Sequence, residues 1–315
     1  MSKYFDQKNL FLEPQVDQYG SHMVMTDVAR EKKIKYLTID TRFRDYYDTS
    51  TVANYNISLP ERVNSVRSMT LRSVELPISF YNISSQLQNN SFTVKNLLVE
   101  KTIVLDDNQY SESGTNPLGS AVETKLNAST LTWVQNLNVT YDTSTKKITI
   151  ANTNAFNVDI IFDKANCDGG KGGLSPTESL MSKLGWILGF RLANYTIEAG
   201  SSITGEAIMD VHGPRYLYLI IDEFKNGNPH SFLGLSRTSQ LSSQQILGRI
   251  VMDTREYPYG SINPVEFGTR LVSDVRTYGE LVNLQRLNVR IVDEFGRIMN
   301  LNGMDFSFCL ELEHL

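Results

Sequence analysis

Four charged residues stand close together in the segment YLTIDTRFRD, which covers residues 36–45. The carboxyl groups of Asp40 and Asp45 could serve as an acid and a base if Arg42 and Arg44 shifted their pKa values. No histidine or other nucleophile accompanies them, and the charges directly follow an apolar run typical of a strand. Planar guanidinium groups bind carboxylates and backbone carbonyls well. We therefore predict a structural staple, in which Asp40, Arg42 and Arg44 fix the loop after a strand.

Other residues that could support catalysis or metal binding occur in incomplete patterns. The segment DGGKGG lacks the hydroxyl residue that follows the lysine of a phosphate-binding loop, and Cys167 has no neighbour that would make it a nucleophile. Adjacent carboxylates close predicted strands, where solvated acidic residues are common: Asp106 and Asp107, Asp222 and Glu223, Asp293 and Glu294. Metal-binding spacing is missing among the histidines: His22, His212, His230 and His314. We expect no catalytic site, no metal site and no cofactor.

The composition is that of a folded protein with an acidic surface. The chain has 315 residues, of which 41% are apolar and 21% charged, enough to bury a sizeable core. Its formal net charge of -5 argues against a main role in neutralising nucleic-acid phosphates. Two distant cysteines, Cys167 and Cys309, indicate no disulfide framework. The N-terminal segment MSKYFDQKNLFLEPQ lacks the pattern of a signal peptide, and we expect no membrane-spanning segment.

Strand periodicity runs along most of the chain. Short stretches rich in Val, Ile, Thr, Tyr and Phe alternate with clusters of Asn, Gly, Pro and Asp. The clearest alternation lies near the end, where one face carries Phe306, Phe308, Leu310 and Leu312. Turn residues at Asn302 and Gly303 predict a hairpin before it. The pattern predicts an all-β fold: an antiparallel β-sandwich with long loops.

One helix stands out among the strands. Ser175 is a good N-cap, Pro176 suits the first helical position, and Glu178 completes a capping box. Gly185 offers a stop, so we predict one short helix near 175–185. A weaker helical pattern covers residues 236–247.

Changes in periodicity along the sequence also divide the chain into three predicted parts. Residues 1–33 show no clean periodicity and predict an extended N-terminal arm, whose Tyr4, Phe5 and Phe11 could anchor it to a partner. Hairpin signals between two loop-like segments predict an inserted β lobe at 97–165. The sandwich would then comprise residues 34–96 and 166–315.

Two long stretches resemble a recurrent pattern in virion proteins of the nucleocytoplasmic large DNA viruses, of phycodnavirus or mimivirus type. The resemblance covers residues 34–95 and 215–313, and includes LGF and YLYLIIDEF. In the first stretch the pattern consists of D-x-R-F-R after a strand, two Leu-Pro strand ends and a turn rich in Tyr, Ser and Asn. The matching residues are Asp40, Arg42, Phe43, Arg44, Leu59, Pro60, Val66, Leu71, Glu75, Leu76, Pro77, Tyr81 and Asn90.

The resemblance implies a structural, non-enzymatic component of a large icosahedral virus capsid, with a sandwich of jelly-roll type. It implies a minor capsid protein that is made in the host cytoplasm and cements neighbouring shell proteins in the virion. The implied partners are the major capsid protein, other minor capsid proteins and further copies of this chain, with no nucleic acid; contact with an inner membrane stays open. The expected interaction residues are Tyr4, Phe5, Phe11, Asp40, Arg42 and Arg44.

Two other functions fit parts of the sequence. A carbohydrate-binding or glycan-processing β-sandwich would also be rich in Asn, Tyr and strands. A nucleic-acid-contacting scaffold could use the arginines of RSMTLRS and LQRLNVR. The acidic net charge disfavours the scaffold, and those arginines also fit the polar faces of strands.

Overall fold

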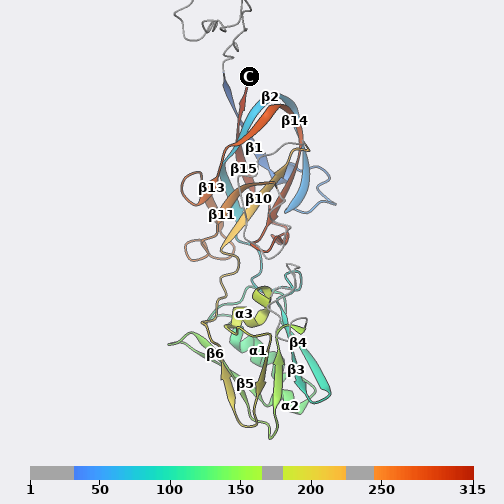
Figure 1. The fold of residues 1–315 in the computed structure, drawn as a ribbon, viewed down its shortest axis with the longest axis vertical. Coiled ribbons are helices and arrows are strands. Elements are labelled where there is room, and N and C mark those ends of the chain that lie inside the picture. Colours follow the sequence, from blue (N-terminus) through green and yellow to red (C-terminus); the bar gives the residue numbers. More distant parts are fainter. Residues whose placement is uncertain (1–31, 165–179, 225–244) are drawn as a thin grey trace, which may run out of the picture.

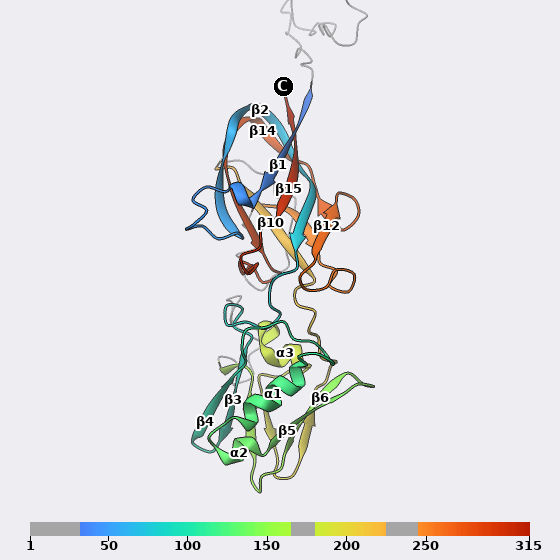
Figure 2. The same ribbon diagram turned by 180° about the vertical axis from the view of Figure 1, so that it is seen from behind.

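The computed structural model describes residues 32–164, 180–224 and 245–315. Antiparallel sheets build two lobes, which follow one another along the long axis of the molecule (Figures 1 and 2). Each lobe encloses its own cluster of buried apolar side chains. The antiparallel all-β fold predicted from the sequence is confirmed.

The first lobe, called here the sandwich lobe, contains an eight-stranded sheet. Its strands follow the order β1-β15-β2-β14-β10-β11-β13, and β12 pairs with β2. The elements are β1 (Lys33–Asp40), the 3-10 helix η1 (Thr41–Phe43), β2 (Asn54–Pro77), β10 (Tyr216–Asp222), β11 (Ile246–Val251), β12 (Ile262–Glu266), β13 (Leu271–Ser273), β14 (Arg276–Val292) and β15 (Ser307–His314).

Strand β2 bends and takes part in both layers of this lobe. Its first half pairs with the end of β14, as in Leu287↔Ile57, and its second half pairs with β15 and β12. Figure 1 shows β2 and β14 arching together over the top of the lobe. The sheet curls so far that Leu71 N of β2 donates to Ser273 Oγ of β13, at 3.4 Å. Apolar side chains from both layers fill the space between them.

The second lobe, called here the inserted lobe, has two smaller sheets and the helices. Strands β4-β3-β7-β8 form one sheet and β5-β6-β9 the other. The elements are β3 (Ser91–Asn96), β4 (Val99–Val104), α1 (Leu118–Asn127), α2 (Thr132–Gln135), β5 (Leu137–Asp142), β6 (Lys147–Asn152), β7 (Val158–Ile161), η3 (Leu180–Ser182), α3 (Leu184–Leu188), β8 (Asn194–Ile197) and β9 (Ser202–Thr204).

The buried cluster of the inserted lobe extends from Ile83 to Val211, a wider span than the 97–165 expected. Strand β3, which precedes the expected range, pairs with β4 inside this lobe. Strand β8 pairs with β7 in the register Val158↔Ile197, although a long segment separates the two strands in sequence. The sequence pattern predicted strand β3 but not β8, and it did not show which strands pair in this lobe.

The helices differ from the prediction. The start of the expected helix, including Ser175, lies outside the described residues, and the helix found nearby is α3. Gly185 lies inside α3 and does not end it; the helix ends at Gly189, whose φ is 97°. Helix α1 was not predicted, although its buried Leu118, Val122 and Leu126 follow helical spacing.

The helix expected from the weaker pattern at 236–247 is not formed in the part of that range that the structure describes. Residues 236–244 lie outside the described residues, but Ile246 and Leu247 belong to strand β11. Their burial in a central strand overrides the local helical preference.

Gly185 lets α3 approach the sheet of the inserted lobe closely. A Cβ atom added there would lie 2.3 Å from Cγ of the Phe162 ring. Phe162 stacks on Phe190 with ring centroids 5.0 Å apart, so it has little room to move. We predict that Gly185→Ala lowers the free energy of unfolding by about 1–3 kcal/mol, measured by urea denaturation. Gly279→Ala is the control, because a Cβ there meets nothing within 4 Å. Equal effects of the two substitutions would contradict this packing.

Candidate functional site

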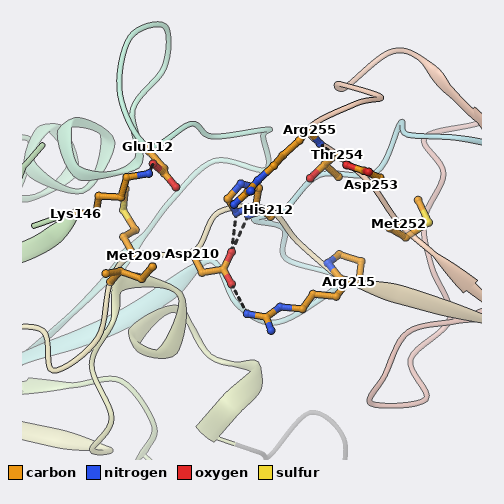
Figure 3. Close-up of a pocket in the computed structure, with 12 residues that line it drawn as sticks. Glu112, Lys146, Met209, Asp210, His212, Arg215, Met252, Asp253, Thr254 and Arg255 are labelled. Carbon is orange, nitrogen blue, oxygen red and sulfur yellow. Dashed lines mark hydrogen bonds and ion pairs between the residues drawn. The ribbon is translucent and has the colours of Figure 1, made fainter. Parts of the chain in front are cut away.

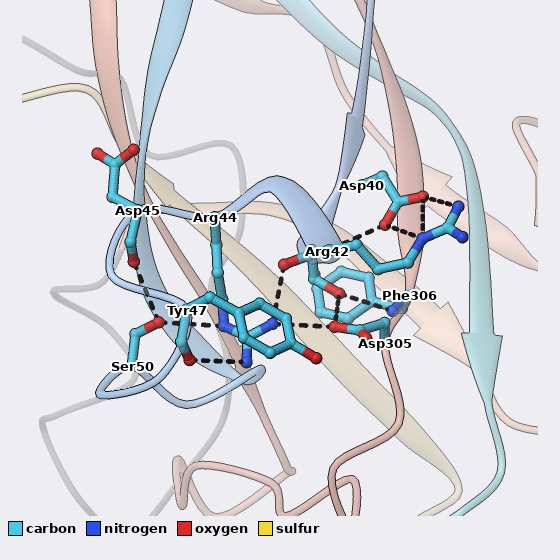
Figure 4. A network of polar contacts seen from close by, with 9 residues as sticks. Asp40, Arg42, Arg44, Asp45, Tyr47, Ser50, Asp305 and Phe306 are labelled. Atoms are coloured by element: carbon cyan, nitrogen blue, oxygen red, sulfur yellow. Dashed lines mark hydrogen bonds and ion pairs between the residues drawn. The ribbon is translucent and has the colours of Figure 1, made fainter.

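The charged cluster of the sequence lies where strand β1 ends and a loop begins. This stretch, residues 41–50, is called here the staple loop (Figure 4). Strand β1 forms one edge of the sandwich sheet, paired with β15 as far as Asp40↔Ser307. The Asp40 side chain caps η1 by accepting a hydrogen bond from Arg42 N at 2.9 Å. The capping hydrogen bond therefore fixes the start of the staple loop to the end of strand β1.

Arg44 is buried at the centre of the staple loop, with its side chain only 5% exposed. Its Nη1 donates to the Thr41 carbonyl and to Asp305 Oδ1, both at 2.9 Å. Its Nε donates to Ser50 Oγ at 3.0 Å, and its Nη2 donates to the Tyr47 carbonyl at 3.3 Å. All three nitrogens of the guanidinium group are thus bonded, which compensates for its burial.

Asp305 and Phe306, which precede strand β15, form the hydrogen bonds that connect this network to the end of the chain. Thr41 is fully buried, and its Oγ1 donates to Asp305 Oδ1 at 2.8 Å. The backbone of Phe306 exchanges two hydrogen bonds with Thr41: its N donates to Oγ1 and its carbonyl accepts from N, each at 3.0 Å. Residues separated by most of the chain are therefore joined at one point. The staple predicted from the sequence exists, but half of it comes from residues that the sequence did not reveal.

Asp40 and Arg42 form a separate ion pair on the surface. Arg42 Nε lies 3.0 Å from both oxygens of Asp40, and its Nη2 lies 2.5 Å from Oδ2. Hydrogen bonds from Arg42 lower the pKa of Asp40. The side chain of Arg42 is 67% exposed, so solvent screens much of this attraction. The two arginines thus differ in role: Arg44 holds the loop, and Arg42 offers a charged group to solvent.

Asp45 joins the staple loop to the first half of β2. Its Oδ2 accepts from Ser58 Oγ at 2.7 Å, and its Oδ1 accepts from Ser58 N at 3.2 Å. Both carboxylates of the segment are therefore engaged in local structure.

Three aromatic side chains project from the loop that this network holds. Phe43 is 75% exposed, Tyr46 77% and Tyr47 48%. The Tyr47 ring lies 3.9 Å from the Arg44 guanidinium carbon, a cation–π contact that fixes its position. The sequence prediction named the charges and missed this aromatic surface, although RFRDYY contained the signal. The expected anchors Tyr4, Phe5 and Phe11 lie outside the described residues.

A second polar region lies in a cleft of about 290 Å³ between the two lobes (Figure 3). Asp210 Oδ1 lies 2.9 Å from His212 Nδ1, and its Oδ2 accepts from Arg215 at 3.1 Å. Burial alone would raise the pKa of Asp210, but these hydrogen bonds lower it. On the inserted lobe, Lys146 Nζ lies 3.1 Å from Glu112. Most of the charged side chains that line the cleft therefore form ion pairs with one another.

Two of the adjacent carboxylates named above form ion pairs with arginines. Asp293 accepts from Arg297 Nε at 2.7 Å in the turn after β14, and buried Glu223 pairs with Arg276 at 2.9 Å. No cluster of three or more potential metal ligands occurs in the described part of the chain. Within the same residues, no helix is long and apolar enough to cross a membrane.

Comparisons with known proteins returned likenesses of shape at low sequence identity. The crystal structure of selenomethionine-labelled mavirus penton protein aligns with a TM-score of 0.43 at 10% identity, covering 91% of this chain and 100% of that one. A chain of the cryo-EM structure of the Sputnik virophage aligns with a TM-score of 0.38 at 12% identity, covering 89% and 98%. No family model matches the chain, and no curated protein matches its sequence.

The burial of Arg44 predicts unequal effects of two neighbouring substitutions. Arg44→Ala should lower the free energy of unfolding by about 2–4 kcal/mol, because it leaves buried carbonyls and Asp305 without their donor. Arg42→Ala should cost less than about 1 kcal/mol, because its ion pair is exposed. Urea denaturation of both variants measures the difference. Losses of the same size would show that Arg44 does not hold the loop.

Glu294 predicts a pH dependence of stability. Burial raises its pKa to about 7, and its Oε2 has no hydrogen-bond partner among the described residues. From about pH 4.5 to 7 the folded protein therefore binds this proton more strongly than the unfolded chain, so stability falls as the pH rises. Glu294→Gln should reduce that fall by on the order of 1–3 kcal/mol. Urea midpoints at several pH values test this, and parallel profiles for the two proteins would contradict it.

Proposed function

We propose that this protein is a structural component of a virus capsid, which binds neighbouring shell proteins through the staple loop. The observation that carries the proposal is the exposed aromatic surface of Phe43, Tyr46 and Tyr47 on a loop held by buried Arg44. The resemblance of the first and last parts of the sequence to virion proteins of large DNA viruses supports the capsid assignment. The D-x-R-F-R motif of that resemblance contains Phe43 and Arg44 themselves.

The chemistry of the loop suits recognition of a protein. Tyrosine and arginine are enriched among the residues that dominate protein interfaces, and rigid aromatic side chains lose little entropy on binding. The Arg44 network fixes the loop before any partner arrives, which lowers the ordering cost of association. Exposed Arg42 adds a charge at the rim of this surface, where it affects orientation and specificity more than affinity.

The finer assignment is that of a minor capsid protein that cements the shell. Its partners would be the major capsid protein, other minor capsid proteins and further copies of this chain. The sandwich would be of jelly-roll type, and the N-terminal arm with Tyr4, Phe5 and Phe11 would add a second contact. Such a role is structural and needs no catalysis.

The proposal predicts that aromatic substitutions on the staple loop impair assembly without unfolding the chain. In Phe43→Ser/Tyr46→Asn both exposed rings are lost, and Asn tolerates the positive φ of 55° at position 46. We expect its copy number in purified particles of the source virus, measured by quantitative mass spectrometry, to fall at least about ten-fold.

The matched control is Val272→Thr, which changes a half-exposed apolar residue on strand β13. Its incorporation should equal that of the unmodified chain, and all three proteins should have the same urea midpoint. Absence of the unmodified chain from purified particles would overturn the capsid role. Normal incorporation of the double variant would overturn the role of the staple loop.

A further inference from the structure

The β3–β4 hairpin of the inserted lobe ends in two exposed leucines. Its strands pair up to Asn96↔Val99, so Leu97 and Leu98 alone form the turn. Leu97 is 84% exposed and Leu98 96%, and Val99 beside them is 49% exposed. The open end of the hairpin lies near the lobe junction, where Leu105 N donates to the Asn90 carbonyl at 2.7 Å. The ribbons of β3 and β4 extend away from the sandwich lobe (Figure 2), so the turn that joins them is remote from that lobe.

These leucines are unfavourable for folding on two grounds. A two-residue hairpin turn prefers Gly, Asn or Asp, because it requires a positive φ. Leu97 has a φ of 53°, which costs a residue with a side chain about 1 kcal/mol. The β5–β6 turn of the same lobe shows the ordinary solution, with Asp142 accepting hydrogen bonds from Ser144 and Thr145. Neither local conformation nor solubility accounts for the leucine pair.

Positive charge lies directly behind the tip. Lys95 and Lys101 lie within about 10 Å of the leucines, given the rise of a strand. The one acidic residue of the hairpin, Glu100, is held between Lys164 at 2.7 Å and Lys95 at 3.7 Å, and hydrogen bonding to Lys164 lowers its pKa. Lys101 has no carboxylate partner among the residues described. The hairpin thus presents an aliphatic end with a cationic shoulder.

This combination fits a lipid surface better than a protein pocket. Leu and Val are under-represented among the residues that dominate protein interfaces, whereas hydrocarbon accepts aliphatic side chains of any shape. Amphipathic helices on membrane surfaces bury their apolar side chains about 5–10 Å into the boundary between headgroups and acyl chains and keep their lysines among the headgroups, and the same division of side chains is present here. Half-exposed Phe156, in the loop before β7, lies at the same end of the sheet, since Lys95 pairs with Asp159.

We infer that the β3–β4 hairpin tip is a membrane-contact site, in which Leu97 and Leu98 enter the surface of an anionic bilayer and Lys95 and Lys101 bind its headgroups. The inference rests on the geometry of the hairpin and does not depend on the proposed capsid role. Two leucines give only weak attachment by themselves, and several copies on one particle would strengthen it by avidity.

The test uses the full chain and vesicles of phosphatidylcholine with and without phosphatidylserine. The unmodified chain should co-sediment with the phosphatidylserine vesicles. Leu97→Gly/Leu98→Asn should reduce this binding at least about ten-fold, because the variant lacks the two leucines that would enter the bilayer. Gly relieves the positive φ at 97, so this variant should be at least as stable as the unmodified chain in urea. Leu192→Asn, at a leucine 57% exposed on the same lobe, is the control and should bind normally.

Three outcomes would overturn the inference or a part of it. If the unmodified chain fails to bind vesicles, or if Leu97→Gly/Leu98→Asn binds them equally well, the hairpin tip is not a membrane-contact site. Equal binding to vesicles with and without phosphatidylserine would show that the lysines do not bind anionic headgroups. A dimer that forms without lipid and is lost in the variant would identify a second copy as the occupant instead.

Discussion

The pairing of strand β2 is the constraint on which the sandwich lobe depends. Its 24 residues form hydrogen bonds with β14, β15 and β12, so that one strand supplies backbone partners to both layers. Buried and more exposed side chains alternate from Tyr55 to Leu59, and residues 60–62 are exposed. Ser65, in the middle of the strand, has a φ of 56°, and residues 68–71 beyond it are all buried. Side chains of a strand point to opposite faces at alternate residues. Because β2 bends, its two halves lie in different layers, and the inward-facing side chains of both halves reach the same core.

The two lobes are connected by buried polar contacts. Asn82, in the segment that leaves β2, is 3% exposed and its Nδ2 donates to the carbonyls of Tyr110 at 2.8 Å and Val211 at 2.6 Å. Val211 lies in the segment that returns to the sandwich lobe. Arg297, in the turn after β14, also donates to the Leu87 carbonyl at 2.7 Å. An Asn-rich stretch in such a place satisfies backbone groups that no sheet can pair.

The staple loop and the hairpin tip depend on the scaffold in different ways. Buried Arg44 uses every guanidinium nitrogen to hold a loop against the start of β15, so the backbone that carries the exposed aromatic side chains is held in place. The hairpin tip needs only the ladder between β3 and β4, and it places two leucines in solvent against local preference. In both, the sheets are rigid supports and the unusual chemistry lies in the connections between strands.

The sequence by itself determined the β class, the last strand of the chain and the staple role of Asp40 and Arg44, whereas the expected contribution of Arg42 to holding the loop is not found. Alternation of apolar residues and the spacing of Asp40, Arg42 and Arg44 are local, so they can be read without a structure. The extent of the inserted lobe, the position of Gly185 inside α3 and the partners of Arg44 at Asp305 came only from the tertiary structure. These features depend on contacts between residues far apart in the chain, and no local pattern specifies which distant strand or carboxylate a residue will meet.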